Sequence, residues 1–177
     1  MTPHGFAGRT DFQRLLTEAL AWAGDQGQRE LHAWDASFVD WPLSDAATLA
    51  ALTAWARPGR QLHLLALQYD DVARRHPRFV RWRRDYAHCV TARAVEPELR
   101  LEAAPESLLL AVGEQGALSL RLFDRHLWRG ELALGAAEYQ RGLEWFDALA
   151  QRSSESFAPT TLGDRKSVGR ERVYDHV

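Results

Sequence analysis

Side chains that could bind a ligand or react follow two apolar segments of the chain. Asp35 comes directly after ELHAW, residues 30–34, and Asp70 follows the apolar run at 62–67. Carboxylates beside a histidine can act as acid and base or hold a metal ion, and arginine presents a planar fork that matches phosphate or carboxylate. We therefore take six residues as the candidate ligand-binding set: Asp35, Asp70, His76, Arg78, Arg81 and Arg84.

Each of these residues also has a purely structural interpretation. Aspartate is favoured at helix N-caps and in turns, where its side chain accepts backbone N–H groups. His76 would then be exposed in a turn before Pro77, and the arginines would form the solvated face of an amphipathic helix. The apolar stripe of that helix is Phe79, Trp82, Tyr86 and Val90.

Two further histidines, His32 and His63, lie at similar places in neighbouring predicted strands. Two histidines alone are an incomplete zinc site, because structural zinc is held by four ligands. We expect both rings to pack or hydrogen-bond within the sheet. The sequence therefore predicts no metal site and no cofactor.

The candidate residues are positioned by an alternation of helices and strands. Apolar residues spaced three and four apart predict helices, and short apolar or alternating runs predict strands. The run at 62–67 fits a strand covered on both faces, a short helix is expected near Asp70, and GEQG at 113–116 fits a hairpin turn. The longer predicted helices are 10–23, 45–57, 77–90 and 136–152, and the predicted strands are 30–34, 62–67, 91–95, 107–112, 117–123 and 127–134.

This order predicts a single α/β domain over residues 10–163, after a flexible N-terminus at 1–9. Its sheet would be mixed, with a parallel part followed by an antiparallel meander and with helices on both faces. Ligands of open α/β sheets bind beyond the carboxyl ends of the parallel strands. Asp35 and Asp70 both fall at such ends, which is why they lead the candidate set.

The composition narrows the class of protein. Its 177 residues are enough for one domain with a sizeable core, and a net charge of −2 argues against a general nucleic-acid binder. Cys89 is the single cysteine, so neither an intrachain disulfide nor a cysteine-rich zinc site can form. We see no secretory signal and no stretch of membrane-span length, and we expect a cytoplasmic protein with no membrane partner.

Lysine occurs once, at Lys166, which excludes Schiff-base and phosphate-loop lysine chemistry from residues 1–163. The segment 164–177 lacks core-like periodicity. Its opening, DRKS, back-translates as GATCGGAAGAGC, which resembles the start of a widely used sequencing adapter. We interpret 164–177 as a disordered tail of non-native sequence and expect the natural chain to diverge after Gly163.

The order of elements resembles half of a phospholipase D-like domain. More narrowly, it resembles the uncharacterised bacterial domain of that kind that often follows a GNAT acetyltransferase domain. The shared features are strands ending in Asp35 and Asp70, the turn with His76, the strand pair around GEQG and the closing helix with Trp145-Phe146. The resemblance covers roughly residues 10–163.

Active members of that superfamily carry an H-x-K-x-x-x-x-D motif. By resemblance its place here is the strand that enters GEQG, where the matching residues are Ser107, Leu109 and Glu114. The nucleophilic histidine and the lysine are missing, so no catalytic residue carries over. We therefore expect no phosphodiesterase activity by that mechanism.

The resemblance implies a non-catalytic phospholipase D-like domain that binds a phosphorylated small molecule or a protein partner through the candidate set. Such folds commonly pair two halves, so it also implies a homodimer. Two alternatives stay open. One is an interaction or accessory module that uses exposed aromatic residues around Trp41 and Trp128. The other is an enzyme with Asp/His chemistry, whose activity would be lost on Asp35→Asn or Asp70→Asn.

Overall fold

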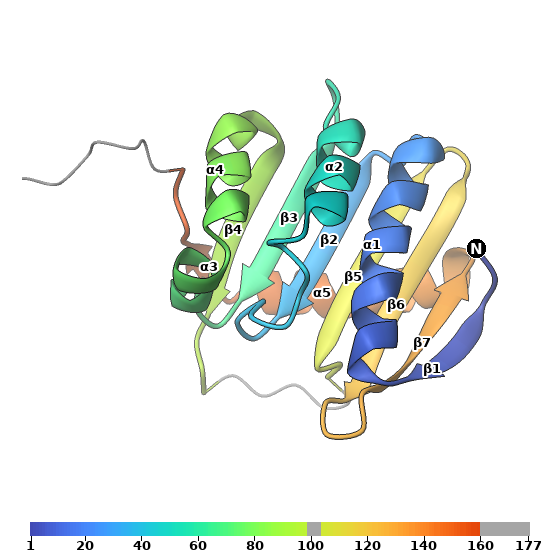
Figure 1. Ribbon diagram of the computed structural model, residues 1–177. Helices are drawn as coiled ribbons and strands as arrows, with labels where there is room; N and C mark the ends of the chain where they lie inside the picture. The colour runs from blue at the N-terminus through green and yellow to red at the C-terminus, as the bar shows by residue number, and fades with distance from the viewer. Residues whose placement is uncertain (99–103, 160–177) are drawn as a thin grey trace, which may run out of the picture.

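A computed structural model describes residues 1–98 and 104–159 as one mixed sheet flanked by helices (Figure 1). Its eight strands follow the order β1-β7-β6-β5-β2-β3-β4-β8. The strands are β1 His4–Ala7, β2 Glu30–Asp35, β3 Gln61–Ala66, β4 Val90–Val95, β5 Ser107–Gly113, β6 Gly116–Asp124, β7 Arg129–Leu134 and β8 Ser153–Glu155. The helices are α1 Arg9–Asp25, α2 Ala46–Trp55, α3 Asp70–Arg75, α4 Pro77–Asp85, the 3-10 turn Ala87–Cys89 and α5 Ala136–Ala150.

The sheet joins a parallel part to an antiparallel part at β2. Strands β2, β3 and β4 are parallel, as expected where helices connect successive strands. Strand β5 pairs antiparallel with β2, and β6 and β7 continue as a meander. The predicted mixed sheet, and the hairpin at GEQG within it, are confirmed.

Helices cover both faces of the sheet, with α1, α2, α3 and α4 on one side and α5 behind (Figure 1). Successive side chains of a strand point to opposite faces, so each strand serves two cores. In β2, Leu31 and Ala33 belong to the core under the four-helix side, and Trp34 belongs to the smaller core under α5. The side chain of His32 also lies on the α5 face, where it contacts Phe146.

Two edge strands have no counterpart among the predicted elements. Residues 1–9 were expected to be flexible, but His4–Ala7 pair antiparallel with β7. Phe6 is buried there against Gly130, where an added Cβ would lie 2.4 Å from the Phe6 ring and 2.1 Å from the Arg121 carbonyl oxygen. The second strand, β8, follows α5 and pairs with β4. Both are short edge strands with few apolar residues, so periodicity gives no signal for them.

Some local boundaries follow the expected chemistry and others do not. The helix predicted for 77–90 ends at Asp85, and Val90 of its predicted apolar stripe begins β4. Pro77 lies in the first turn of α4, and His76 separates α3 from α4 as predicted. Asp45 precedes α2 but makes no capping hydrogen bond through its side chain, and Asp70 is the first residue of α3 rather than its cap. The predicted tail at 164–177 lies outside the described residues. None of the helices in the described ranges is both long and apolar enough to span a bilayer.

Candidate functional site

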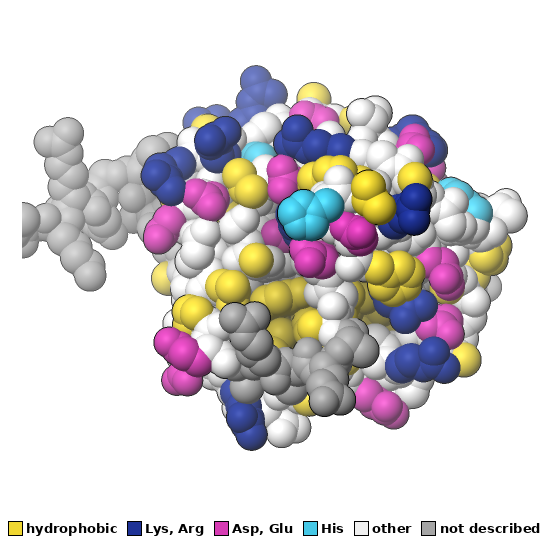
Figure 2. Space-filling model, turned by 90° about the horizontal axis from the view of Figure 1, so that it is seen from below, with side chains coloured by type: hydrophobic (Ala, Val, Ile, Leu, Met, Phe, Trp, Pro, Cys, Tyr) yellow, Lys and Arg dark blue, Asp and Glu magenta, His cyan; other side chains and the backbone are white. Residues whose placement is uncertain are grey.

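The carboxyl ends of β2 and β3 meet the start of β5 at one edge of the sheet. The sheet changes from parallel to antiparallel pairing between β2 and β5, and ligands of open α/β sheets usually bind beyond the carboxyl ends of the strands at such a switch point. We call this end of the sheet the switch-point edge. Asp35, the last residue of β2, lies opposite Ser107, the first residue of β5. Figure 2 looks onto the lower side of the molecule and shows acidic, basic and apolar side chains interleaved there.

Asp35 is fully buried and its carboxylate is occupied by internal contacts. Its Oδ1 accepts hydrogen bonds from the backbone N–H groups of Ser37 (3.1 Å) and Phe38 (2.8 Å). These bonds form an Asx-type turn at the end of β2, and Phe38 takes a left-handed φ of 57° within it. The other oxygen, Oδ2, accepts from Arg125 at 2.7 Å.

Arg125 comes from the connection between β6 and β7 and binds three carboxylates. Its nitrogens lie 2.7 Å from Asp35, 2.8 Å from Asp40 and 3.3 Å from Glu106. Burial alone would lower the pKa of Arg125, but the charges of Asp35 and Asp40 and the hydrogen bond to Glu106 outweigh it and raise the pKa. We call Arg125, Asp35, Asp40 and Glu106 the Arg125 cluster. Its cation is fully neutralised, so it has no capacity left for an external anion.

Ser107 is held by the indole of Trp41. Trp41 Nε1 donates to Ser107 Oγ at 2.8 Å, and Ser107 Oγ donates to the Trp34 carbonyl at 3.2 Å. Ser107 is fully buried and Trp41 is 4% exposed. The expectation that Trp41 belongs to an exposed aromatic patch is therefore wrong. The loop after β2 folds its tryptophan inward because the apolar ring fills the core and the polar N–H finds a partner.

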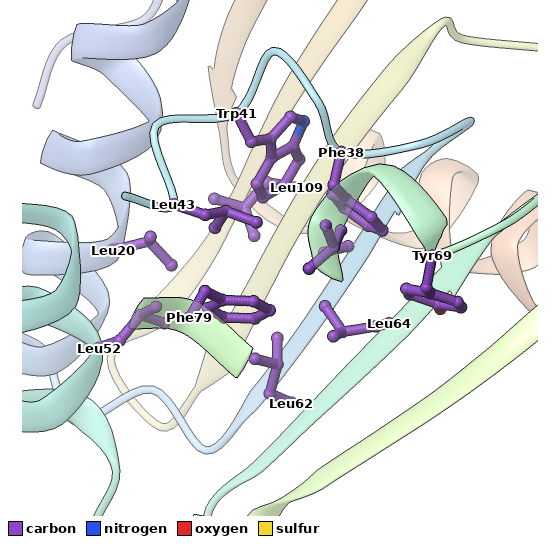
Figure 3. Close-up of a pocket in the computed structure, with 12 residues that line it drawn as sticks. Leu20, Phe38, Trp41, Leu43, Leu52, Leu62, Leu64, Tyr69, Phe79 and Leu109 are labelled. Carbon is purple, nitrogen blue, oxygen red and sulfur yellow. The ribbon is translucent and has the colours of Figure 1, made fainter. Parts of the chain in front are cut away.

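A small cavity lies behind this indole, between the sheet and the helices. Its volume is about 20 Å³, and its lining residues are all apolar or aromatic, among them Trp41, Phe38 and Leu109 (Figure 3). A cavity of this size holds about one water molecule at most, and an apolar one stays dry. We therefore interpret it as a packing defect of the core, too small for a metabolite.

The two other residues expected near Asp35 have separate environments. Asp70 is exposed in the first turn of α3. His76 is buried, at 7% exposure, rather than exposed as its structural interpretation assumed. Its ring nitrogens hydrogen-bond with the Ser44 hydroxyl (2.6 Å) and the Val39 carbonyl (3.2 Å). His76 thereby ties the loop after β2 to the junction between α3 and α4.

The three candidate arginines lie along the outer side of α4. Arg78 and Arg81 are exposed, and Arg84 forms an ion pair with Asp85 at 3.2 Å. No contact joins them to Asp35 in the described residues. Whether the six-residue set binds an anion stays a prediction.

A different arginine of α4 is buried without a partner. Arg83 is 5% exposed, and its Nε and Nη1 atoms are buried with no hydrogen-bond acceptor in the described part of the chain. Its guanidinium lies 5.9 Å from the centre of the Phe157 ring. Burial lowers the pKa of Arg83, and the weaker opposing effects of Tyr69 and Cys89 do not cancel that shift.

Arg83 borders a groove of about 670 Å³ between α4, β4 and the residues that follow β8. Arg93 lies in the same groove and donates to Ser153 Oγ and to its carbonyl oxygen, at 2.7 and 2.6 Å. Thr91 and Ser156 contribute polar lining, and Glu155 contributes one exposed acidic side chain. The groove is thus lined by two arginines and a single acidic residue.

Neither Arg83 nor Arg125 is among the candidate residues predicted from the sequence. A signal for Arg83 is present, because it lies four residues after Phe79 and beside Trp82 and so shares the apolar side of the helix. Arg125 carries no such signal. It lies in a turn, and its buried partner Asp35 is 90 residues away along the chain.

Comparison with known proteins finds similarity at the level of structure. No protein-family profile matches the chain, and no curated protein matches its sequence. A phospholipase D family member, Nuc from Salmonella typhimurium, superposes with a TM-score of 0.55 at 10% identity, over 88% of this chain and 99% of that one. NucT from Helicobacter pylori gives 0.51 at 8% identity, over the same shares.

The chain has a phospholipase D-like fold. A third similar structure is TrmBL2, an archaeal chromatin protein with a described mode of DNA binding. It gives a TM-score of 0.57 at 12% identity, over 88% of this chain but 54% of its own length. The present chain therefore spans about half of that protein and the whole of the two phospholipase D family members.

Proposed function

We propose that this chain is a non-catalytic phospholipase D-like domain that binds an anionic, phosphorylated ligand. The observation that carries the proposal is Arg83, a buried guanidinium with two unpartnered donors in the described residues, beside a groove that holds Arg93. A buried charge without a partner is costly. An anion that enters the groove would receive charge-assisted hydrogen bonds from Arg83 and offset that cost.

The switch-point edge supports the non-catalytic part of the proposal. By resemblance, Ser107 stands at the place of the nucleophilic histidine and Leu109 at the place of the lysine. Ser107 is buried beneath Trp41, and the carboxylate of Asp35 is bound to Arg125. Because these groups are already bound within the fold, we assign anion binding to the groove beside Arg83 of α4 instead.

The test compares two arginines of the same helix. Thermal unfolding is measured with inorganic phosphate, pyrophosphate, a nucleoside triphosphate and a short single-stranded oligonucleotide. A ligand at a hundred times its dissociation constant should stabilise the protein by about 2.7 kcal/mol. Arg83→Met should abolish that rise in melting temperature, and Arg78→Gln, which removes an exposed charge, should preserve it.

Each result has a distinct meaning. A rise that survives Arg83→Met but disappears in Arg78→Gln would contradict the groove and favour the outer face of α4, with Arg81 and Arg84. A response to the oligonucleotide alone would identify nucleic acid as the anion, as for the DNA-binding neighbour. No rise with any anion would contradict ligand binding altogether.

A second candidate is a protein-interaction module, and one observation favours it. Phe123, near the end of β6, and Leu127, in the β6–β7 connection, are 49% and 54% exposed, and exposed apolar side chains can mark a partner surface. The resemblance to paired half-domains suggests a second copy of the chain as the partner. Sedimentation velocity should then show a dimer that Leu127→Asp dissociates and His126→Asp, on the same turn, leaves intact. A monomer at all concentrations would contradict this candidate.

A further inference from the structure

Three metal-ligating side chains meet on the α5 face of the sheet, near the amino ends of β2 and β3. Glu30 and His32 are two residues apart on β2 and therefore project from the same face. His63 lies beside His32 in the register of β3. One ligand atom from each of the three residues lies within 4.8 Å of the others. This edge is opposite the one that carries the Arg125 cluster.

The donor set suits a transition metal ion. Imidazole nitrogen together with carboxylate oxygen is the ligand chemistry of zinc, cobalt and related divalent ions. Three protein ligands with a fourth position left to water is a common zinc arrangement. We propose that Glu30, His32 and His63 form a binding site for a divalent transition metal ion of the zinc class.

The surroundings of His63 orient it for this role. Its Nε2 lies 2.7 Å from Glu30 Oε2, and its Nδ1 lies 2.9 Å from the Thr91 hydroxyl oxygen. A metal-bound histidine usually donates its second ring N–H to a neighbouring oxygen, which fixes the tautomer. When Nδ1–H donates to Thr91, the lone pair of Nε2 points toward the Glu30 side. An ion about 2.1 Å from both Nε2 and Oε2 would then replace the hydrogen bond between these atoms.

His32 adds a second imidazole. Its ring stacks on His63 with 4.7 Å between centroids and meets the edge of Phe146 at 4.9 Å. Its Nδ1 atom is buried with no hydrogen-bond partner in the described ranges.

Glu30 supplies the carboxylate of the proposed site. In the described residues its only ion-pair partner is His63. Tyr139 of α5 lies close enough for the charge of Glu30 to contribute, after burial, to raising the pKa of the phenol to about 12. The phenol therefore stays neutral and adds no competing charge. The site presents one carboxylate and two imidazole rings to a divalent cation.

The experiment uses the full chain without an affinity tag, freed of metal by dialysis against a chelator. Co²⁺ titration should produce a saturable visible d–d absorption with one ion per chain, and Zn²⁺ should displace it. His63→Gln and His32→Gln should each weaken Co²⁺ binding at least tenfold. Glu30→Gln, which keeps the size of the side chain and can still hydrogen-bond to His63, should also weaken it.

Two controls separate this site from adventitious binding to surface histidines. His88→Gln and His126→Gln remove exposed imidazoles elsewhere and should leave the Co²⁺ affinity unchanged. Melting curves of the metal-free variants check that each one folds. Absence of a saturable band, or a band that keeps its affinity in both His63→Gln and Glu30→Gln, would overturn the proposal.

Discussion

Two arginines with opposite environments define the two regions of this molecule. Arg125, at the switch-point edge, is 27% exposed and binds three carboxylates. Arg83, on α4, is 5% exposed and has no acceptor for two of its nitrogens in the described residues. Arg125 is thus more exposed to solvent and also has more carboxylate partners. Arg83 is nearly buried and has no carboxylate partner among the described residues.

Arg125 is therefore a structural charge, whereas Arg83 is the charge that we propose binds an anion. A buried charge that is paired and hydrogen-bonded can be retained in the fold, whereas an unpaired one costs stability. The Arg125 cluster holds the turn after β2, the β6–β7 connection and the residue before β5 together. Among the described residues, Arg83 forms no ion pair of this kind and contacts the Phe157 ring. The comparison predicts that mutations near Arg125 lower the free energy of unfolding. Replacement of Arg83 by an apolar residue should raise it.

The largest effect is expected for Asp35→Ala. This change leaves Arg125 without its buried partner and leaves two backbone N–H groups, those of Ser37 and Phe38, without an acceptor. Breaking a buried pair by removing one partner costs about 3–5 kcal/mol. Urea denaturation should show this loss of unfolding free energy. Asp40→Ala is the control, and a loss as large as that of Asp35→Ala would show that burial of the carboxylate does not matter.

The next effect concerns the indole that covers Ser107. Trp41→Phe removes the 2.8 Å hydrogen bond but keeps an aromatic ring, and we expect a loss of about 1–2 kcal/mol. A double-mutant cycle with Ser107→Ala isolates the bond, with an expected coupling of about 1 kcal/mol. Additive losses in the two single variants would mean that Trp41 contributes by packing alone.

A gain in stability is expected at Arg83. Arg83→Met replaces an unpaired buried guanidinium with an apolar chain of similar length, which should stabilise the ligand-free protein by about 1 kcal/mol. The same variant should lose the response to anions. Chemical denaturation without ligand measures the first effect. A clear destabilisation would place Arg83 among the structural charges, with Arg125.

The smallest effect is expected for Arg78→Gln. Arg78 is exposed on α4 and makes no ion pair with the described residues. Surface substitutions of this kind change the unfolding free energy by no more than about 0.5 kcal/mol. The same denaturation measurement serves as a baseline for the Arg83 variant. A loss comparable to that of Trp41→Phe would reveal a structural contact of Arg78.

Much of the fold was predictable because local patterns agree with it. The run at 62–67 is a strand covered on both faces, GEQG is a hairpin turn, and the stripe with Phe79 and Trp82 forms a buried helix side. The spacing of apolar residues within one helix or strand indicates which of its faces is buried, without knowledge of the other elements. The edge strands at His4–Ala7 and Ser153–Glu155 were missed because short edge strands carry little apolar pattern.

The candidate site was predictable only in part. Asp35 was correctly placed at the carboxyl end of its strand, but its partner was not foreseen, since Arg125 is far away in the sequence. Trp41 was expected to be exposed because it lies in a loop, yet the loop turns inward over β5. His32 and His63 were recognised as neighbours, but Glu30 was not counted with them, although strand periodicity places it on the same face.

The sequence by itself determined the class of fold, the mixture of parallel and antiparallel strands and the absence of lysine chemistry from residues 1–163. These properties depend on composition and on short-range periodicity, and both can be obtained from the linear sequence alone. The tertiary structure alone decided which charges are neutralised. Arg83 and Arg125 are the same residue type, and their difference comes from partners that only folding brings within a few ångströms. The energy of an electrostatic interaction at that range depends on the distance between the charges and on their burial. Neither can be predicted from the spacing of the residues along the chain.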